Sequence, residues 1–299
     1  MIRSRSPRRG GFTLIELLVV VAILALLAAL TTAGVARVRS AQQAKASDNT
    51  LTKLQLALDA QWLAVVGQCH KDRMQKPAQP QFAALVTFCD NDVDRAESLW
   101  VYMNLRRAFP ETFTEATSAI ALGGVTLQPR KTFAGVGTSG TPAQDSAALL
   151  YLIMSESATM GVAFSADDVT QGAQTDFTIG STKYRAFKDA WGTPVTFRRF
   201  LSNTELLAPP YVKPGATHTD TLDPLRKLRD WTSGTGPTNK PLGESAVGGT
   251  FDGNLKTPTV VSAGPNQGFD SGSPVGSNAT GTTDDVFGYR LRRQGTRGD

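Results

Sequence analysis

The feature that most constrains this chain is a long apolar run near its amino terminus. From Phe12 to Ala36 the sequence reads FTLIELLVVVAILALLAALTTAGVA, in which Glu16 is the only charged residue. As an α-helix this run would extend about 37 Å, which is enough to cross a bilayer. The run therefore predicts one membrane-spanning helix.

Basic residues flank this helix on both sides. Arg37 and Arg39 follow it, and a denser group precedes it at Arg3, Arg5, Arg8 and Arg9. The excess of positive charge before the helix predicts a cytoplasmic amino terminus and an outward-facing carboxy-terminal part. An ordinary secretory signal has a shorter apolar core followed by its cleavage site, whereas here the Gly10-Gly11 pair lies before the core.

The basic character of the chain comes from its first residues. The sequence has 31 Lys and Arg against 26 Asp and Glu, with a pI of about 9.3. Removal of the four leader arginines leaves 27 basic residues, so the rest of the chain is nearly neutral. This argues against nucleic-acid binding driven by phosphate contacts.

Glu16 is a carboxylate in an otherwise apolar helix. Its burial in hydrocarbon would cost several kcal/mol unless it is neutralised. Cleavage after Gly11 would give Phe12 a free amine four residues before Glu16, and the amine of a neighbouring subunit would supply the positive charge. Glu16 thus argues for cleavage and assembly together.

The segment GG-FTLIELLVVVAIL resembles the type III signal of type IV pilins and of the pseudopilins of type II secretion. The resemblance implies cleavage between Gly11 and Phe12 by a prepilin peptidase, methylation of the new Phe12 amine, and a role for Glu16 in assembly. A plain signal-anchor helix is the alternative. Many pilins kink this helix with a proline, whereas the weak point here is the stretch from Thr31 to Gly34.

The chain is expected to have four parts. Residues 1–11 are a cleaved basic leader, residues 12–36 the transmembrane and assembly helix, residues 37–67 its amphipathic continuation, and residues 68–299 an extracytoplasmic head with a loop-rich insertion at 208–256. The continuation is predicted from Leu51, Leu54, Leu58 and Trp62, which recur at near-helical spacing, and Gly67 is its predicted end.

The predicted fold class is α+β and pilin-like, with the long amino-terminal helix packed on a small antiparallel β-sheet among extra helices and long loops. Helices are expected at Asp94–Phe109, at Asp145–Met160 with Asp145 or Ser146 at the cap, and around Leu222–Trp231. A strand pair is expected within Phe177–Leu201, around the turn Asp189–Pro194, and another strand at Thr257–Ser262.

Two segments of the head extend the resemblance. DAWGTPVTF resembles the DPWGNPY-type segment of the major pseudopilin (protein G-like) of type II secretion, and VVSAGPNQGFD resembles its SxGxDG-type loop. In that family the loop holds calcium, which implies Asp270 and Asp284 as the best ligands, with Asn266, Asp285 and backbone carbonyls near Ser262. A solvated loop of side-chain turns is the alternative, since the spacing is not that of an EF-hand.

Cys69 and Cys89 are the only cysteines. In an extracytoplasmic head they can pair, which would stabilise it by about 3 kcal/mol; two buried thiols are the alternative. A zinc site with His70 and His218 is disfavoured, because Cys69 and His70 are adjacent. Gly135–Gly140 matches GxGxxG, but no buried strand precedes it, which favours a linker. No catalytic site is predicted.

The predicted function is that of a pseudopilin, a structural subunit that polymerises through its hydrophobic helix to support protein export. Its expected partners are copies of itself, other pseudopilins, a prepilin peptidase and the inner-membrane assembly platform. Its expected location is the bacterial inner membrane, as a single-pass protein with a periplasmic head. One alternative is a minor type IV pilin with an adhesive or DNA-binding head, which an exposed patch would favour, formed by Lys183, Tyr184, Arg185, Arg198 and Arg199. Another is a membrane-anchored hydrolase, which would need carboxylates converging in a cleft.

Overall fold

The computed structural model describes residues 14–75, 79–155, 171–201, 205–209, 211–213, 215–216, 218–232, 247–269 and 284–291. The chain divides into two compact units, Met1–Lys45 and Ala46–Asp299. The first unit contains the beginning of helix α1. The second is a head in which helices combine with small antiparallel sheets, so the predicted α+β class is confirmed.

Helix α1 (Leu14–Met74) has two chemically different halves. In the first unit its described apolar side chains are exposed. Their exposed fractions include 82% for Leu14, 48% for Val19 and 64% for Leu30. The predicted weak point is helical: Thr31 and Thr32 donate their hydroxyls to carbonyls three and four residues earlier. The apolar surface of this half is therefore continuous along the helix.

In the head, α1 buries Leu51, Leu54 and Leu58 completely, as their spacing predicted. It also passes through Gly67, where the sequence predicted its end, and stops at Met74. A helical glycine costs about 1 kcal/mol relative to alanine. Burial of Val65 and Cys69 on either side of Gly67 outweighs that local cost.

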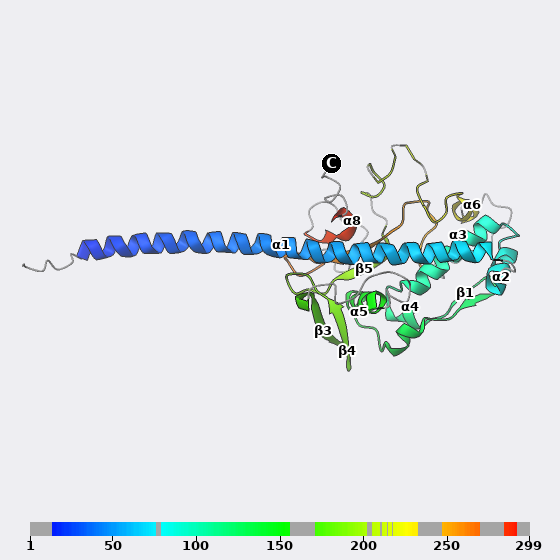
Figure 1. Ribbon diagram of the computed structural model, residues 1–299, viewed down its shortest axis with the longest axis horizontal. Helices are drawn as coiled ribbons and strands as arrows, with labels where there is room; N and C mark the ends of the chain where they lie inside the picture. The colour runs from blue at the N-terminus through cyan, green and yellow to red at the C-terminus, as the bar shows by residue number, and fades with distance from the viewer. Residues whose placement is uncertain are drawn as a thin grey trace, which may run out of the picture. The chain divides into compact units, whose positions relative to one another are not determined.

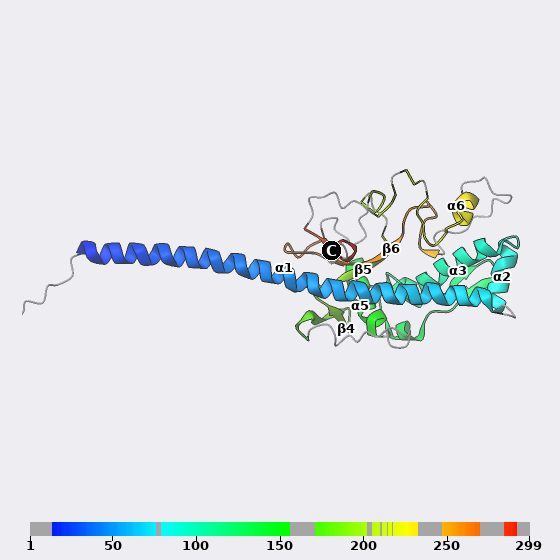
Figure 2. The same cartoon turned by 45° about the horizontal axis from the view of Figure 1, so that its top comes forward.

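Figure 1 and Figure 2 show this half of α1 running along the head beside α5 and the β5–β6 sheet. Its polar side chains tie these elements together. Gln61 Nε2 donates to the carbonyl of Ile153 in α5 at 3.2 Å. The Gln55 side chain donates to Pro258 O at 2.9 Å and accepts from Val260 N at 3.0 Å. Its amide thus makes the two hydrogen bonds to β6 that the backbone of a neighbouring strand would make.

Several of the helices after α1 begin at a side-chain cap. They comprise α2 (Pro80–Phe88), α3 (Val93–Ala108), α4 (Phe113–Thr117), the 3₁₀ helix η1 (Lys131–Gly135), α5 (Pro142–Ser155), α6 (Lys227–Thr232) and α8 (Gly288–Leu291). Helix α3 begins within one residue of its prediction, because Asp92 accepts from Arg95 N. Helix α5 begins three residues earlier than predicted, because the cap is Thr141 rather than Asp145 or Ser146, and Thr141 forms a capping box with Gln144 in the first turn. Residues 156–160 of that predicted helix lie outside the described ranges.

All strand pairs of the described residues are antiparallel. The strands are β1 (Ile120–Leu122) with β2 (Val125–Leu127), β3 (Gln174–Ile179) with β4 (Thr182–Phe187), and a sheet of order β5 (Thr196–Leu201), β6 (Thr257–Ser262) and β7 (Val286–Phe287). The short 3₁₀ helix η4 (Gln171–Ala173) precedes β3. The prediction for β6 is confirmed.

The strands predicted on either side of the turn Asp189–Pro194 are present as β4 and β5, but the predicted pairing between them is limited to the turn itself. They meet at the Lys188–Pro194 bridge, where Val195 N donates to Phe187 O at 2.8 Å and Asp189 N donates to Thr193 O at 2.9 Å. Each has its main partner elsewhere, because a second turn at Gly180 (φ 59°) folds β3 back on β4. Strand β5 is then available to pair with β6.

One apolar core joins α1, α3, α5 and the sheets. The predicted insertion at 208–256 contributes to it through Leu222, Leu228, Val247 and Phe251, all buried. The described part of the insertion is thus more than a surface loop. A smaller cluster lies around β7 and α8, formed by Leu201, Leu206, Val261, Phe287 and Tyr289.

Candidate functional site

The amino-terminal site is an apolar helix with a carboxylate at its start. Gly11 and Phe12 lie outside the described residues, and Glu16 lies in the first turn of α1. Among the residues described, α1 is the one helix long and apolar enough to cross a membrane, by length and composition, and none of its most apolar window is buried. A carboxylate in a first turn interacts favourably with the helix dipole. Residues 14–36 of α1 therefore offer an apolar packing surface in which Glu16 is the only charged residue.

A second candidate site joins the two head segments noted in the sequence. Asp189 is 4% exposed. Its Oδ1 accepts from Trp191 N at 3.0 Å and Thr193 N at 2.8 Å, and its Oδ2 accepts from the Ser262 hydroxyl at 2.7 Å. The segments DAWGTPVTF and VVSAGPNQGFD are thereby fastened together. Sequence reasoning quoted both segments but did not predict this contact.

The loop after β6 closes on Asp284. Asn266 donates to the Asp284 carboxylate from its backbone N at 2.9 Å and from Nδ2 at 2.6 Å. Gly264 has a φ of 68°, and a Cβ atom there would lie 2.2 Å from the Asp284 carbonyl oxygen. Glycine is thus required at this position, both for its conformation and for the close approach of the backbone.

These contacts bear on the predicted calcium ligands. The structure brings Asn266 and Asp284 together and places Asp285 next in the chain, while Asp270 lies outside the described residues. Oxygen donors suit calcium. However, the Asp284 oxygens accept hydrogen bonds from Asn266, and Asn266 Oδ1 accepts from Gly268 N, as in a side-chain turn. Calcium binding stays a prediction.

The two cysteines are buried, and the structure records both as thiols rather than as a disulfide, so the predicted Cys69–Cys89 bond is not formed in it. Burial, together with the nearby charges of Asp72 and Glu97, raises the pKa of Cys69 to about 12. The thiol therefore stays protonated and is a poor nucleophile and metal ligand.

The zinc candidates are engaged elsewhere. His70 contacts the Glu97 carboxylate, and His218 Nε2 contacts the carbonyl of Asp223. Within the described ranges, no three His, Cys, Asp or Glu side chains come together as metal ligands. In the GxGxxG stretch, Gly137 N donates to the Tyr184 hydroxyl and Gly140 N to Asp145, so these amides are used within the head.

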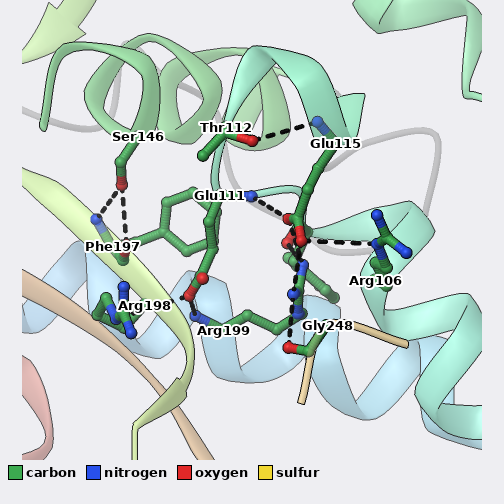
Figure 3. A network of polar contacts seen from close by, with 10 residues as sticks. Arg106, Glu111, Thr112, Glu115, Ser146, Phe197, Arg198, Arg199 and Gly248 are labelled. Carbon is green, nitrogen blue, oxygen red and sulfur yellow. Dashed lines mark hydrogen bonds and ion pairs between the residues drawn. The ribbon is translucent and has the colours of Figure 1, made fainter. Parts of the chain in front are cut away.

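The basic and aromatic patch that would favour a DNA-binding head is not formed as one surface. Lys183 and Arg185 are exposed and both pair with Asp176, at 2.9 and 3.4 Å. In contrast, Arg199 is 1% exposed and faces the interior (Figure 3). A patch split in this way offers no continuous basic surface to a nucleic acid.

The buried Arg199 organises a network of ion pairs, shown in Figure 3. Its guanidinium donates to both oxygens of Glu115 at 2.9 and 3.2 Å, to Phe109 O at 2.9 Å and to Gly248 O at 3.0 Å. Burial raises the pKa of Glu115, but the Arg199 charge and hydrogen bonds outweigh burial, so the pKa lies below its ordinary value. The network fastens α4, β5 and the insertion to one another.

Two buried carboxylates in the insertion, Asp220 and Asp223, also serve the fold. Asp220 accepts from the Tyr102 hydroxyl and from Leu222 N. Asp223 accepts three backbone N–H groups at the start of α6. Burial raises the pKa of both carboxyl groups. Their hydrogen bonds are those of structural caps.

Comparison with known proteins gives one match, at the amino terminus. Residues 6–32 match the family model described as the prokaryotic N-terminal methylation motif. Neither the curated proteins nor the solved structures give a match. The matched range contains Gly11, Phe12 and Glu16 and the start of the exposed apolar half of α1. The chain therefore carries the N-terminal methylation motif of type IV pilin-like proteins.

Proposed function

We propose that this chain is a pseudopilin, a structural subunit of a filament that supports type II protein secretion. The observation that carries the proposal is the methylation motif, whose described part, from Leu14 onward, lies on an exposed apolar helix with Glu16 in its first turn. Proteins with this motif are structural subunits. We therefore assign the chain an assembly role and no bond-making chemistry.

Assembly would use the first half of α1. Prepilin peptidase would cut between Gly11 and Phe12, and the amine of a neighbouring subunit would lie near Glu16. Neutralisation removes the several kcal/mol that an isolated carboxylate costs in an apolar environment. The expected partners are further copies, other pseudopilins and the inner-membrane assembly platform, with the amino terminus in the cytoplasm and the head in the periplasm.

The choice of type II secretion is supported by the head. The segments that resemble the major pseudopilin meet through the 2.7 Å bond between Asp189 and Ser262. The alternative of a minor pilin with a DNA-binding head depended on an exposed basic patch, and the burial of Arg199 removes a member of that patch. The carboxylates at Asp220 and Asp223 are occupied by structural hydrogen bonds, which weakens the case for a hydrolase.

Processing provides the first test. The full-length chain would be co-expressed with and without a prepilin peptidase, extracted from membranes, and analysed by intact mass and amino-terminal sequencing. We expect a mature chain that begins at methylated Phe12 only with the peptidase, and an uncut chain for Gly11→Ala. Gly34→Ala is the matched control, since a Cβ there meets no other atom within 4 Å. A wild-type chain that keeps Met1 in the presence of the peptidase would remove the main support for the proposal.

Assembly provides the second test. With the peptidase and an assembly platform present, Glu16→Ala is expected to be cleaved but not to sediment in filaments, because the apolar helix then lacks the charge that pairs with a neighbour's amine. Filament formation by Glu16→Ala at the wild-type level would contradict this role of Glu16.

A further inference from the structure

A cavity of about 340 Å³ lies between α1, the last turns of α3 and the segment after β2. Ala64 and Val65 of α1 and Ala108 of α3 form its apolar wall. Arg107 and Arg130 bring two guanidinium groups to the same cavity. The volume is in the range of small-molecule sites, and a few charged groups on an apolar wall are typical of such sites.

The Arg107 side chain is held in place by one hydrogen bond. Its Nε donates to Gln128 O at 2.8 Å, and within the described ranges its two terminal nitrogens have no acceptor. Burial and the charge of Arg130 lower the pKa of Arg107. Its place in the last turn of α3 favours a cation there through the helix dipole.

The two ends of the cavity differ in the charged residue that they carry, Arg107 at one end and Asp72 at the other. The ring of Trp62 in α1 packs against the ring of Phe109, which follows α3, with the ring centroids 5.7 Å apart. Further along α1, Asp72 accepts a hydrogen bond from Trp100 Nε1 at 3.1 Å. Helices α1 and α3 therefore run antiparallel here. Arg107 therefore lies near the Phe109 end and Asp72 near the Trp100 end. Ala64 and Asp72 are separated by roughly 12 Å along α1. An anionic ligand would place its charge at the arginine end.

We propose that this cavity binds a small organic oxyanion, a carboxylate or phosphate carried on a short apolar group. The oxyanion lies between Arg107 and Arg130, where guanidinium groups offer the paired donors that carboxylate and phosphate accept. The apolar group lies against Ala64, Val65 and Ala108. The site belongs to the head and does not depend on filament assembly.

The test uses the full-length chain in an uncharged detergent and isothermal titration calorimetry. The probes are N-acetyl-leucine, its uncharged amide and inorganic phosphate. We expect saturable binding of N-acetyl-leucine and none of the amide. Arg107→Gln should weaken binding by about tenfold or more, because it removes a charge-assisted pair of hydrogen bonds. The control Arg185→Gln changes an exposed arginine of β4 and should bind like the wild type.

Ala64→Phe is a second variant, which fills the cavity and leaves both charges in place. It should abolish binding, and it carries the test if Arg107→Gln fails to fold, which a thermal melt would reveal. If inorganic phosphate binds and N-acetyl-leucine does not, the proposal of a ligand with an apolar group is overturned and the arginines form a simple anion site. The proposal is also overturned if the wild type binds neither N-acetyl-leucine nor phosphate, or if the uncharged amide binds as well as N-acetyl-leucine. Binding of N-acetyl-leucine by Ala64→Phe at the wild-type affinity would overturn it too.

Discussion

Arg199 allows a direct test of how the head is held together, because its one buried guanidinium donates hydrogen bonds to Phe109, Glu115 and Gly248. In Arg199→Met the aliphatic volume is kept, while Glu115 loses its bidentate partner and the carbonyls of Phe109 and Gly248 lose their donors. Glu115 keeps a weaker partner in Arg106, whose Nε lies 3.5 Å from its carboxylate.

The expected loss follows from these contacts. Removal of one member of a buried ion pair costs about 3–5 kcal/mol, and the remaining Arg106 contact places this variant near 3 kcal/mol. For a domain of this size that loss lowers the melting temperature by roughly 6–12 °C. The double variant Arg199→Met, Glu115→Gln removes the orphaned charge and should regain about 1–2 kcal/mol.

The assay is unfolding of the full-length chain in detergent, followed by near-ultraviolet circular dichroism as a function of pH. Because the pKa of Glu115 is lowered in the folded head, its stabilisation is present above its ordinary value of 4.5 and is lost as the pH falls through the folded pKa. The gap between wild type and Arg199→Met should therefore narrow below about pH 4.5.

The exposed variant Arg185→Met is the control and should melt at the wild-type temperature, because its ion pair with Asp176 is exposed to solvent. The reasoning fails if Arg199→Met loses less than about 1 kcal/mol at pH 7, well under the loss expected for a buried pair. It also fails if the double variant is less stable than the single one.

Three further predictions concern other parts of the head. Cys69, whose pKa of about 12 keeps the thiol protonated, should resist iodoacetamide at pH 8 until the chain is denatured, and mass spectrometry showing native labelling would contradict this. Asp189→Ala should lower the free energy of unfolding by about 2 kcal/mol, because three donors including the Ser262 hydroxyl lose their acceptor. Asp189→Asn keeps one amide oxygen as an acceptor and should lose less stability. Equal losses for the two variants in denaturant titrations would contradict this. Calcium chloride should raise the melting temperature of the wild type but not of Asp284→Ala, and an unchanged wild-type melt with and without chelator would leave Asn266 and Asp284 as a side-chain turn.

The parts of the fold that the sequence predicted well are those specified by local pattern. The apolar run and the spacing of Leu51, Leu54 and Leu58 predicted the two halves of α1. The end of that helix was predicted wrongly, since Gly67 is a local signal and the burial of Cys69 beyond it is a tertiary effect. Strand alternation likewise indicates strands but not their partners, although Gly180 was a turn signal that could have separated β3 from β4.

The head sites needed the structure for a physical reason. Arg198 and Arg199 are adjacent and chemically identical, and only the alternation of β5 decides which of them faces inward with Phe197 and Leu201. The link between Asp189 and Ser262 joins residues that are 73 positions apart. Sequence pattern places each residue on its element, but the distance between elements is set by packing of the whole head.

The register of the three-stranded sheet also sets the entropy cost of closing the long segment of chain between β5 and β6. Leu201 of β5 pairs with Thr257 of β6, so roughly 55 residues leave and return at one point. Closing so long an excursion costs about 2 kcal/mol more than closing a four-residue hairpin. The contacts of Asp220 with Tyr102 and of Gly248 with Arg199 fasten the excursion at two intermediate points and offset part of that cost. Because each doubling of a loop's length adds only about 0.6 kcal/mol, the length of the excursion has a small effect on the pairing of β5 with β6.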